Sequence, residues 1–211
     1  MTTEDLIRAL VADRLVGRRL PLALLWALAA AVAVVSALFF SWIGFREDIG
    51  AALRTARFLF KFVVMAPLAV LSLAGLLRSA GPVSVPGWWK TLLPLPLVVL
   101  VIGVAAEMLM IPPSAWLVRL IGSNAANCMM LIPLLACVPL ALFIMMLKGG
   151  APANAGMAGA TAGLAAGSIA ALFYAANCFD DSPLFVITWY PLAIGSVVLA
   201  GHFAGRRVLK W

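Results

Sequence analysis

Two of the three cysteines occupy the same tetrapeptide, AANC, at residues 125–128 and again at 175–178. Paired thiols at an oxidising surface form a structural disulfide, act as a reversible redox switch, or contribute to a metal site. The simplest alternative is that Cys128 and Cys178 are small apolar side chains near helix ends. Cys137 is expected about 13 Å deeper by helical rise, where the ordinary apolar role is favoured.

Three carboxylates are predicted on the same side as these thiols, at Glu107, Asp180 and Asp181, and they are candidate neighbours of a sensor. A metal site needs more ligands than two thiols, and neither CxxC nor HxxxH spacing occurs. We therefore expect no permanent cofactor. A disulfide or a transiently bound metal ion at Cys128 and Cys178 remains open.

The composition requires that these residues be positioned in a membrane. Of 211 residues, 65% are hydrophobic and only 11% are charged, whereas soluble domains are about half apolar and a quarter charged. The net charge of +7 reflects basic residues beside helix ends, with no Lys/Arg stripe typical of nucleic-acid binding. We predict an all-α integral membrane protein that does not contact nucleic acid directly.

Apolar runs of about 20 residues predict six transmembrane helices. The expected spans are residues 22–42, 58–77, 91–109, 127–147, 156–176 and 184–205, which together form one domain over residues 21–211. Glycines spaced four apart in the last two spans predict close helix packing. They are Gly159, Gly163, Gly167, Gly201 and Gly205.

The distribution of Lys and Arg predicts that both termini face the cytoplasm. One side holds ten basic residues and the other five. The ten are Arg8, Arg14, Arg18, Arg19, Arg78, Lys90, Lys148, Arg206, Arg207 and Lys210, and the five are Arg46, Arg54, Arg57, Lys61 and Arg119. Spans four and five then form an antiparallel hairpin with Cys128 and Cys178 level at the outer surface.

Two ionisable residues, Lys61 and Glu107, lie inside predicted spans, where charge is costly and often functional. Both are near outer ends, so they are expected to reach the interface or to pair with each other. A structural salt bridge is favoured over a transport path, which needs more polar groups. Ser182 and Pro183 are expected to begin the last span as N-cap and first-turn proline.

Residues 1–20 predict a short amphipathic helix on the cytoplasmic side. Thr3 is a candidate N-cap, and Asp5 lies in the first turn, where acids are favoured. An apolar stripe follows at helical spacing: Leu6, Ile7, Leu10 and Val11. A helix of about ten residues is unstable alone, so it is expected to lie on the membrane interface or to fold onto a partner.

Several longer motifs resemble those of the NrsF type of membrane anti-sigma factor, the negative regulator of sigma F. They are TEDLIRALVAD at the N-terminus, RFLFK opening span two, a cysteine opening span four, CFDDSPLFVITWY, and GRRVLKW at the C-terminus. The resemblance covers essentially all 211 residues. The CFDDSPLF run is its most specific part.

The resemblance implies a multi-pass protein of the bacterial inner membrane that is not an enzyme. Such a protein holds an extracytoplasmic-function sigma factor inactive and releases it on metal or oxidant stress, with two periplasmic cysteines serving the response. Cys128 and Cys178 occupy those motif positions, and Cys137 has no counterpart. The N-terminal segment is expected to contact sigma, with Asp5, Leu6, Ile7, Leu10 and Val11 as inferred contacts.

Two other classes compete with this interpretation. A membrane thiol oxidoreductase usually carries a close cysteine pair, whereas Cys128 and Cys178 are fifty residues apart. A small transporter needs polar groups and broken helices near the midplane, and only the peripheral Glu107 and Lys61 qualify.

Overall fold

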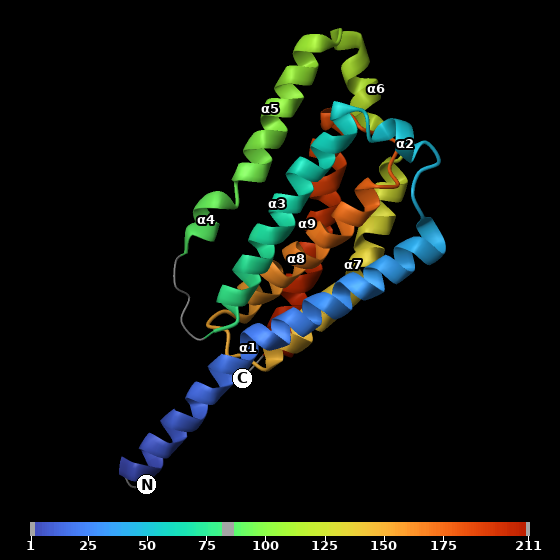
Figure 1. Cartoon of the computed structure of the whole chain (residues 1–211). Coiled ribbons are helices and arrows are strands. Elements are labelled where there is room, and N and C mark those ends of the chain that lie inside the picture. The colour runs from blue at the N-terminus through green and yellow to red at the C-terminus, as the bar shows by residue number, and fades with distance from the viewer. Residues whose placement is uncertain (1–2, 82–86, 210–211) are drawn as a thin grey trace.

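The computed structural model describes residues 3–81 and 87–209, and within them the regular structure is entirely helical (Figure 1). The side chains of residues 3 and 5–21 lie outside this description. The contacts expected for Asp5, Leu6, Ile7, Leu10 and Val11 therefore fall outside the described side chains, although their backbone is helical.

Six helical segments of the described chain are long and apolar enough to cross a membrane. The bounds of these helices agree with the predicted spans to within a few residues. The exceptions are the N-terminal end of the first span and the start of the third span. The long helices are α1 (Thr3–Leu38, followed by a π-helical turn η1, Phe39–Ile43), α3 (Ala56–Ser79), α5 (Leu95–Met110), α7 (Ala125–Lys148), α8 (Ala155–Ala175) and α9 (Pro183–Val208). The short elements are α2 (Ile49–Ala52), α4 (Trp88–Leu92), the 3₁₀ turn η2 (Pro113–Ala115) and α6 (Trp116–Ile121).

The predicted separate helix at the N-terminus is wrong, because α1 is continuous from Thr3 to Leu38. Its first turns project beyond the other helices (Figure 1). The first span supplies the helical nucleus, and each further residue then adds a hydrogen bond without a new nucleation cost. The third span is instead divided at Leu93–Pro94 into α4 and α5, because proline removes a donor and disfavours a helix that continues across it.

Helix α8 lies at the centre of the bundle, in contact with α3, α7 and α9. The close helix packing predicted for the glycines is confirmed, and the structure shows that α8 and α9 pack against each other through them. A Cβ atom on Gly163 would lie 2.5 Å from the backbone oxygen of Val197, and one on Gly201 would collide with the backbone oxygen of Gly159. The missing side chains therefore allow the two backbones to touch.

Candidate functional site

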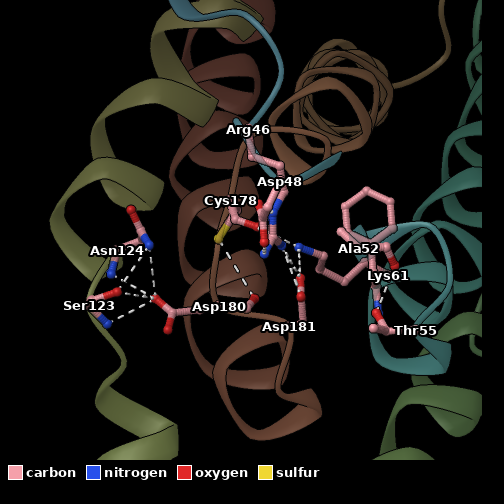
Figure 2. A network of polar contacts seen from close by, with 11 residues as sticks. Arg46, Asp48, Ala52, Thr55, Lys61, Ser123, Asn124, Cys178, Asp180 and Asp181 are labelled. Atoms are coloured by element: carbon pink, nitrogen blue, oxygen red, sulfur yellow. Dashed lines mark hydrogen bonds and ion pairs between the residues drawn. The ribbon is translucent and has the colours of Figure 1, made fainter. Parts of the chain in front are cut away.

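The two AANC cysteines lie at the same end of the bundle, which we call the cysteine end. Cys128 is in the first turn of α7, and its backbone N–H donates to the Asn124 oxygen at 2.8 Å. Cys178 lies in the connection between α8 and α9 (Figure 2). Both thiols are free and fully buried, and they belong to one apolar cluster with Tyr174 and Tyr190.

Two buried cations surround the Cys178 backbone. Lys61 is fully buried, and its ammonium lies 2.6 Å from Asp181 Oδ1 and donates to the Cys178 carbonyl at 2.9 Å (Figure 2). Arg46 Nη1 donates to Asp181 Oδ2 at 2.9 Å and to the same carbonyl at 3.3 Å. Its Nε donates to Asp48 Oδ1 at 2.6 Å. Two cations thus meet two carboxylates, and we call Arg46, Asp48, Lys61 and Asp181 the Asp181 cluster.

The ionisation of this end follows from these contacts. The hydrogen bonds between Asp48 and Arg46 raise the pKa of the guanidinium, against its partial burial, and lower the pKa of the Asp48 carboxyl. Burial raises the pKa of the Cys178 thiol, and the nearby Lys61 cation only partly opposes it. Cys178 is therefore protonated at neutral pH. Because the thiolate is the reactive form, the thiol reacts more slowly in this arrangement than a free cysteine.

The connection that follows α1 is hydrogen-bonded to the connection that carries Cys178. Asn177 Nδ2 donates to the Gly44 oxygen at 3.1 Å, and the Arg46 N–H donates to the Ala176 oxygen at 3.4 Å. Gly44 has a φ of 72°, which only glycine adopts at little cost. The C-terminal end of α1 is thus attached, through η1 and this turn, to the loop around Cys178.

Asp180 joins the Cys178 loop to the start of α7. Its Oδ2 accepts from the backbone N–H groups of Ser123 at 2.9 Å and Asn124 at 2.8 Å, and from the side chains of both residues (Figure 2). Gly122 precedes them with a φ of 61°, and a Cβ there would lie 2.8 Å from Asp180 Oδ2. Glycine is therefore needed for both the turn and the close approach.

Glu107 is buried between three other elements. Its Oε1 lies 2.8 Å from Arg119 Nη1 and 3.5 Å from Arg57 Nη2. Its Oε2 accepts from the Ser182 hydroxyl at 2.5 Å and from the Leu184 N–H at 3.4 Å. The Glu107 carboxylate therefore caps α9, a helix that begins 76 residues later in the chain. Ser182 occupies the N-cap position, as predicted, but its side chain does not make the capping bond.

The comparison with protein families decides what kind of protein carries this arrangement. The family model for NrsF, negative regulator of sigma F, matches residues 10–211. The chain belongs to the NrsF family. It is 30% identical to a probable anti-sigma-F factor NrsF of Azospira oryzae and 31% identical to an anti-sigma-F factor NrsF of Caulobacter vibrioides, in each case over the full length of both chains. No solved structure matches it.

In this NrsF chain, the structure brings Cys128, Cys178, Asp180 and Asp181 to one end, with Glu107 beside the same loop. Lys61 and Glu107 do not pair with each other, which is one of the two alternatives predicted from the sequence, because Lys61 binds Asp181 and Glu107 binds Arg119. Both residues make salt bridges, the role that the sequence favours over a transport path. Cys137 is exposed on α7, and its thiol donates to the Pro133 oxygen at 3.2 Å.

The basic and polar partners in this NrsF site are not apparent from the sequence alone. Arg46, Arg57 and Arg119 contribute there only to the predicted topology, and no pattern singles out Ser123 or Asn124. One feature of the sequence does indicate such contacts: adjacent acidic residues and several arginines are predicted at the same helix ends. Among the described residues, no three His, Cys, Asp or Glu side chains are placed to hold a metal ion. The carboxylates next to the thiols already bind protein donors.

Proposed function

We propose that this chain is a membrane anti-sigma factor that holds an extracytoplasmic-function sigma factor at the inner membrane and releases it on an envelope signal. Membership of the NrsF family is the observation that carries the proposal. The two relatives, a probable anti-sigma-F factor and an anti-sigma-F factor, support the same role. Six apolar helices suit a protein of the membrane, and the excess of basic residues on one side favours cytoplasmic termini.

The sigma-binding segment in this proposal is the N-terminal part of α1, with contacts from Asp5, Leu6, Ile7, Leu10 and Val11. An amphipathic helix that projects into the cytoplasm offers an apolar stripe to a groove on a partner. Its projection beyond the bundle leaves this backbone accessible from several sides (Figure 1). The partner is the sigma factor rather than DNA.

The signal, metal or oxidant stress, acts in this proposal on Cys128 and Cys178 at the periplasmic face. The two buried thiols, with Cys178 protonated, represent the resting state, in which sigma is held. A reaction at Cys178 moves a backbone whose carbonyl is bound by Lys61 and Arg46. Because Arg46 follows α1 and its loop is bonded to the Cys178 loop, that movement is transmitted to α1 as a displacement of a continuous helix.

The energies set a condition on this mechanism. Complete switching of a two-state equilibrium needs about 5.5 kcal/mol of differential stabilisation. A disulfide contributes about 2–4 kcal/mol, and disruption of a buried ion pair costs about 3–5 kcal/mol. A disulfide alone therefore falls short of complete switching and offsets at most the loss of one of the three ion pairs of the Asp181 cluster. The proposed released state thus keeps most of these ion pairs in a shifted arrangement.

Co-purification tests the sigma-binding part of the proposal. The full-length protein, extracted in mild detergent, should retain its sigma factor, and deletion of residues 1–20 should abolish the association. Substitution of Leu6 and Leu10 by Asp should have the same effect with the membrane domain intact. Retention of sigma by the truncated protein would place the binding surface elsewhere.

A double substitution tests the sensing part separately. Cys128→Ser/Cys178→Ser should still hold sigma but give no release with oxidant or metal, measured with a sigma-dependent reporter. Cys137→Ser is the matched control and should respond normally. Constitutive release in the double variant would show that the thiols stabilise the fold, while the anti-sigma role would stand.

A further inference from the structure

The end of the bundle opposite the cysteines, which we call the basic end, contains a small cavity between α3, α4 and α8. Its volume is about 260 Å³, and it is lined by Arg78, Ser79, Trp89, Lys90, Asn154, Met157 and Thr161. No carboxylate lines it. Neither Arg78 nor Lys90 makes an ion pair within the described part of the chain. Two positive charges therefore face a cavity without a counter-charge.

Trp89, one of the lining residues, has a buried donor that lacks an acceptor. Trp89 is 8% exposed, and its Nε1–H has no hydrogen-bond partner among the described residues. The six-membered ring of the indole lies against Gly75, whereas its Cδ1 edge lies beside the Arg78 guanidinium at Gly87. Buried indole N–H groups normally find a partner. The Trp89 N–H and the Arg78 guanidinium together form a donor set that matches an anionic oxygen.

A separate apolar groove lies next along the same helices, nearer the middle of the bundle. It has a volume of about 440 Å³ and is lined by α3, α5, α8 and α9 and by the Leu93–Pro94 break. Along α8, Leu164 of the groove is one turn from Thr161 of the cavity, and along the α4–α5 segment Leu93 is three residues from Lys90. Gly195 faces open space, with nothing within 4 Å of a Cβ built there.

We propose that this site binds an anionic phospholipid, with its phosphate at Arg78, Lys90 and Trp89 Nε1 and an acyl chain in the groove. Basic pockets between membrane helices suit lipid phosphates, and tryptophan is enriched at the headgroup level. The adjoining apolar groove distinguishes a lipid from a free phosphate, because a free phosphate leaves the groove empty. The cytoplasmic leaflet follows from the orientation in the proposed function; the binding itself does not depend on it.

Native mass spectrometry of the full-length protein with defined lipids tests this site. We expect one tightly retained phosphatidylglycerol, preferred over phosphatidylcholine. Arg78→Gln/Lys90→Gln should weaken retention about tenfold or more, since charge-assisted hydrogen bonds are lost. Trp89→Phe, which keeps the ring and removes the N–H, should weaken it about threefold to tenfold. Lys148→Gln/Arg207→Gln is the control, with the same charge change at the same end outside the cavity.

Gly195→Leu, which fills the groove, should weaken lipid retention, whereas Ala141→Leu on an exposed face of α7 should not. Gel filtration and the thermal midpoint of each variant establish that it is folded. An equal loss of lipid retention in Lys148→Gln/Arg207→Gln would attribute the effect to general surface charge and overturn the proposal. Unchanged retention in Gly195→Leu, with inorganic phosphate competing as well as phosphatidylglycerol, would overturn the acyl-chain assignment. Loss of sigma binding in Arg78→Gln/Lys90→Gln with normal lipid retention would assign the cavity to a protein partner instead.

Discussion

The two ends of the bundle differ in whether their charged side chains are paired. From residue 22 onwards, all five acidic residues, Glu47, Asp48, Glu107, Asp180 and Asp181, belong to the loops or helix ends of the cysteine end. There, buried cations meet carboxylates at 2.6–2.9 Å. Among the described residues from 22 onwards, the basic end has cations alone, among them Arg78, Lys90 and Lys148. The buried charges of one end are paired within the chain, whereas Arg78 and Lys90 at the other make no ion pair with a described residue.

The largest effect is expected from breaking the Asp181 cluster. Asp181→Asn leaves Lys61 and Arg46 with one counter-charge fewer in a buried position, so the free energy of unfolding should fall by about 3–5 kcal/mol. Denaturation in mixed detergent micelles measures it. Lys148→Gln, at the basic end, should change stability by less than about 0.5 kcal/mol. Similar losses at both ends would refute the contrast between them.

The next largest effect is expected at Glu107. Glu107→Gln should cost about 2–3 kcal/mol, because Arg119 loses a charged partner and the α9 cap becomes weaker. Arg57→Gln is the matched control. Arg57 is 47% exposed and lies 3.5 Å from Glu107, so its loss should cost less than about 1 kcal/mol. A larger cost for Arg57 than for Glu107 would reverse the roles assigned to the two residues. The same unfolding measurement decides between them.

A smaller effect is expected from the glycine contacts between α8 and α9, the helices that run between the two ends. Gly201→Ala should cost about 1–3 kcal/mol, because the added methyl group meets the Gly159 carbonyl. Gly195→Ala, in the same helix but facing open space, should be neutral or slightly stabilising through helix propensity. Thermal midpoints of the two variants make the comparison, and equal midpoints would contradict it.

The smallest effect is expected for the pH dependence of the alkylation rate of Cys178. A free cysteine has a pKa of about 8.5, and burial raises the pKa of Cys178. Its thiolate fraction is therefore lower at every pH near neutrality. In a variant with Cys178 as its sole cysteine, alkylation should keep accelerating at pH values where a peptide thiol has reached its plateau. A plateau at or below the peptide value would show a thiol already accessible and ionised.

The helices could be predicted from sequence because apolar run length is a local property. The positions of α3, α7, α8 and α9 and the close packing at their glycines follow from spacing along one segment, whereas the pairing of α8 with α9 does not. Lys61 and Glu107 could be singled out for the same reason, since a charge within an apolar run is visible locally.

The partners of those charges could not be predicted, because they depend on how the loops fold back. Lys61 and Asp181 are 120 residues apart in the chain, and the choice between Asp181 and Glu107 is decided by which helix end each faces. Ser123 and Asn124 contribute mainly backbone N–H groups to Asp180, so their side chains gave little indication of a role. The continuity of α1 could not be predicted either. The helix propensity of ten residues takes no account of the neighbouring span, which is already helical and from which the helix can extend.

The capping of α9 by Glu107 has a consequence for how the protein is made. A ribosome delivers α5 well before α9, so the carboxylate is already in place when the last helix emerges and needs its first-turn acceptor. The order of synthesis is reversed for Asp180. The N–H groups of Ser123 and Asn124 are made first, and their acceptor is synthesised 56 residues or more after them. The start of α7 is thus completed only when the chain is nearly finished.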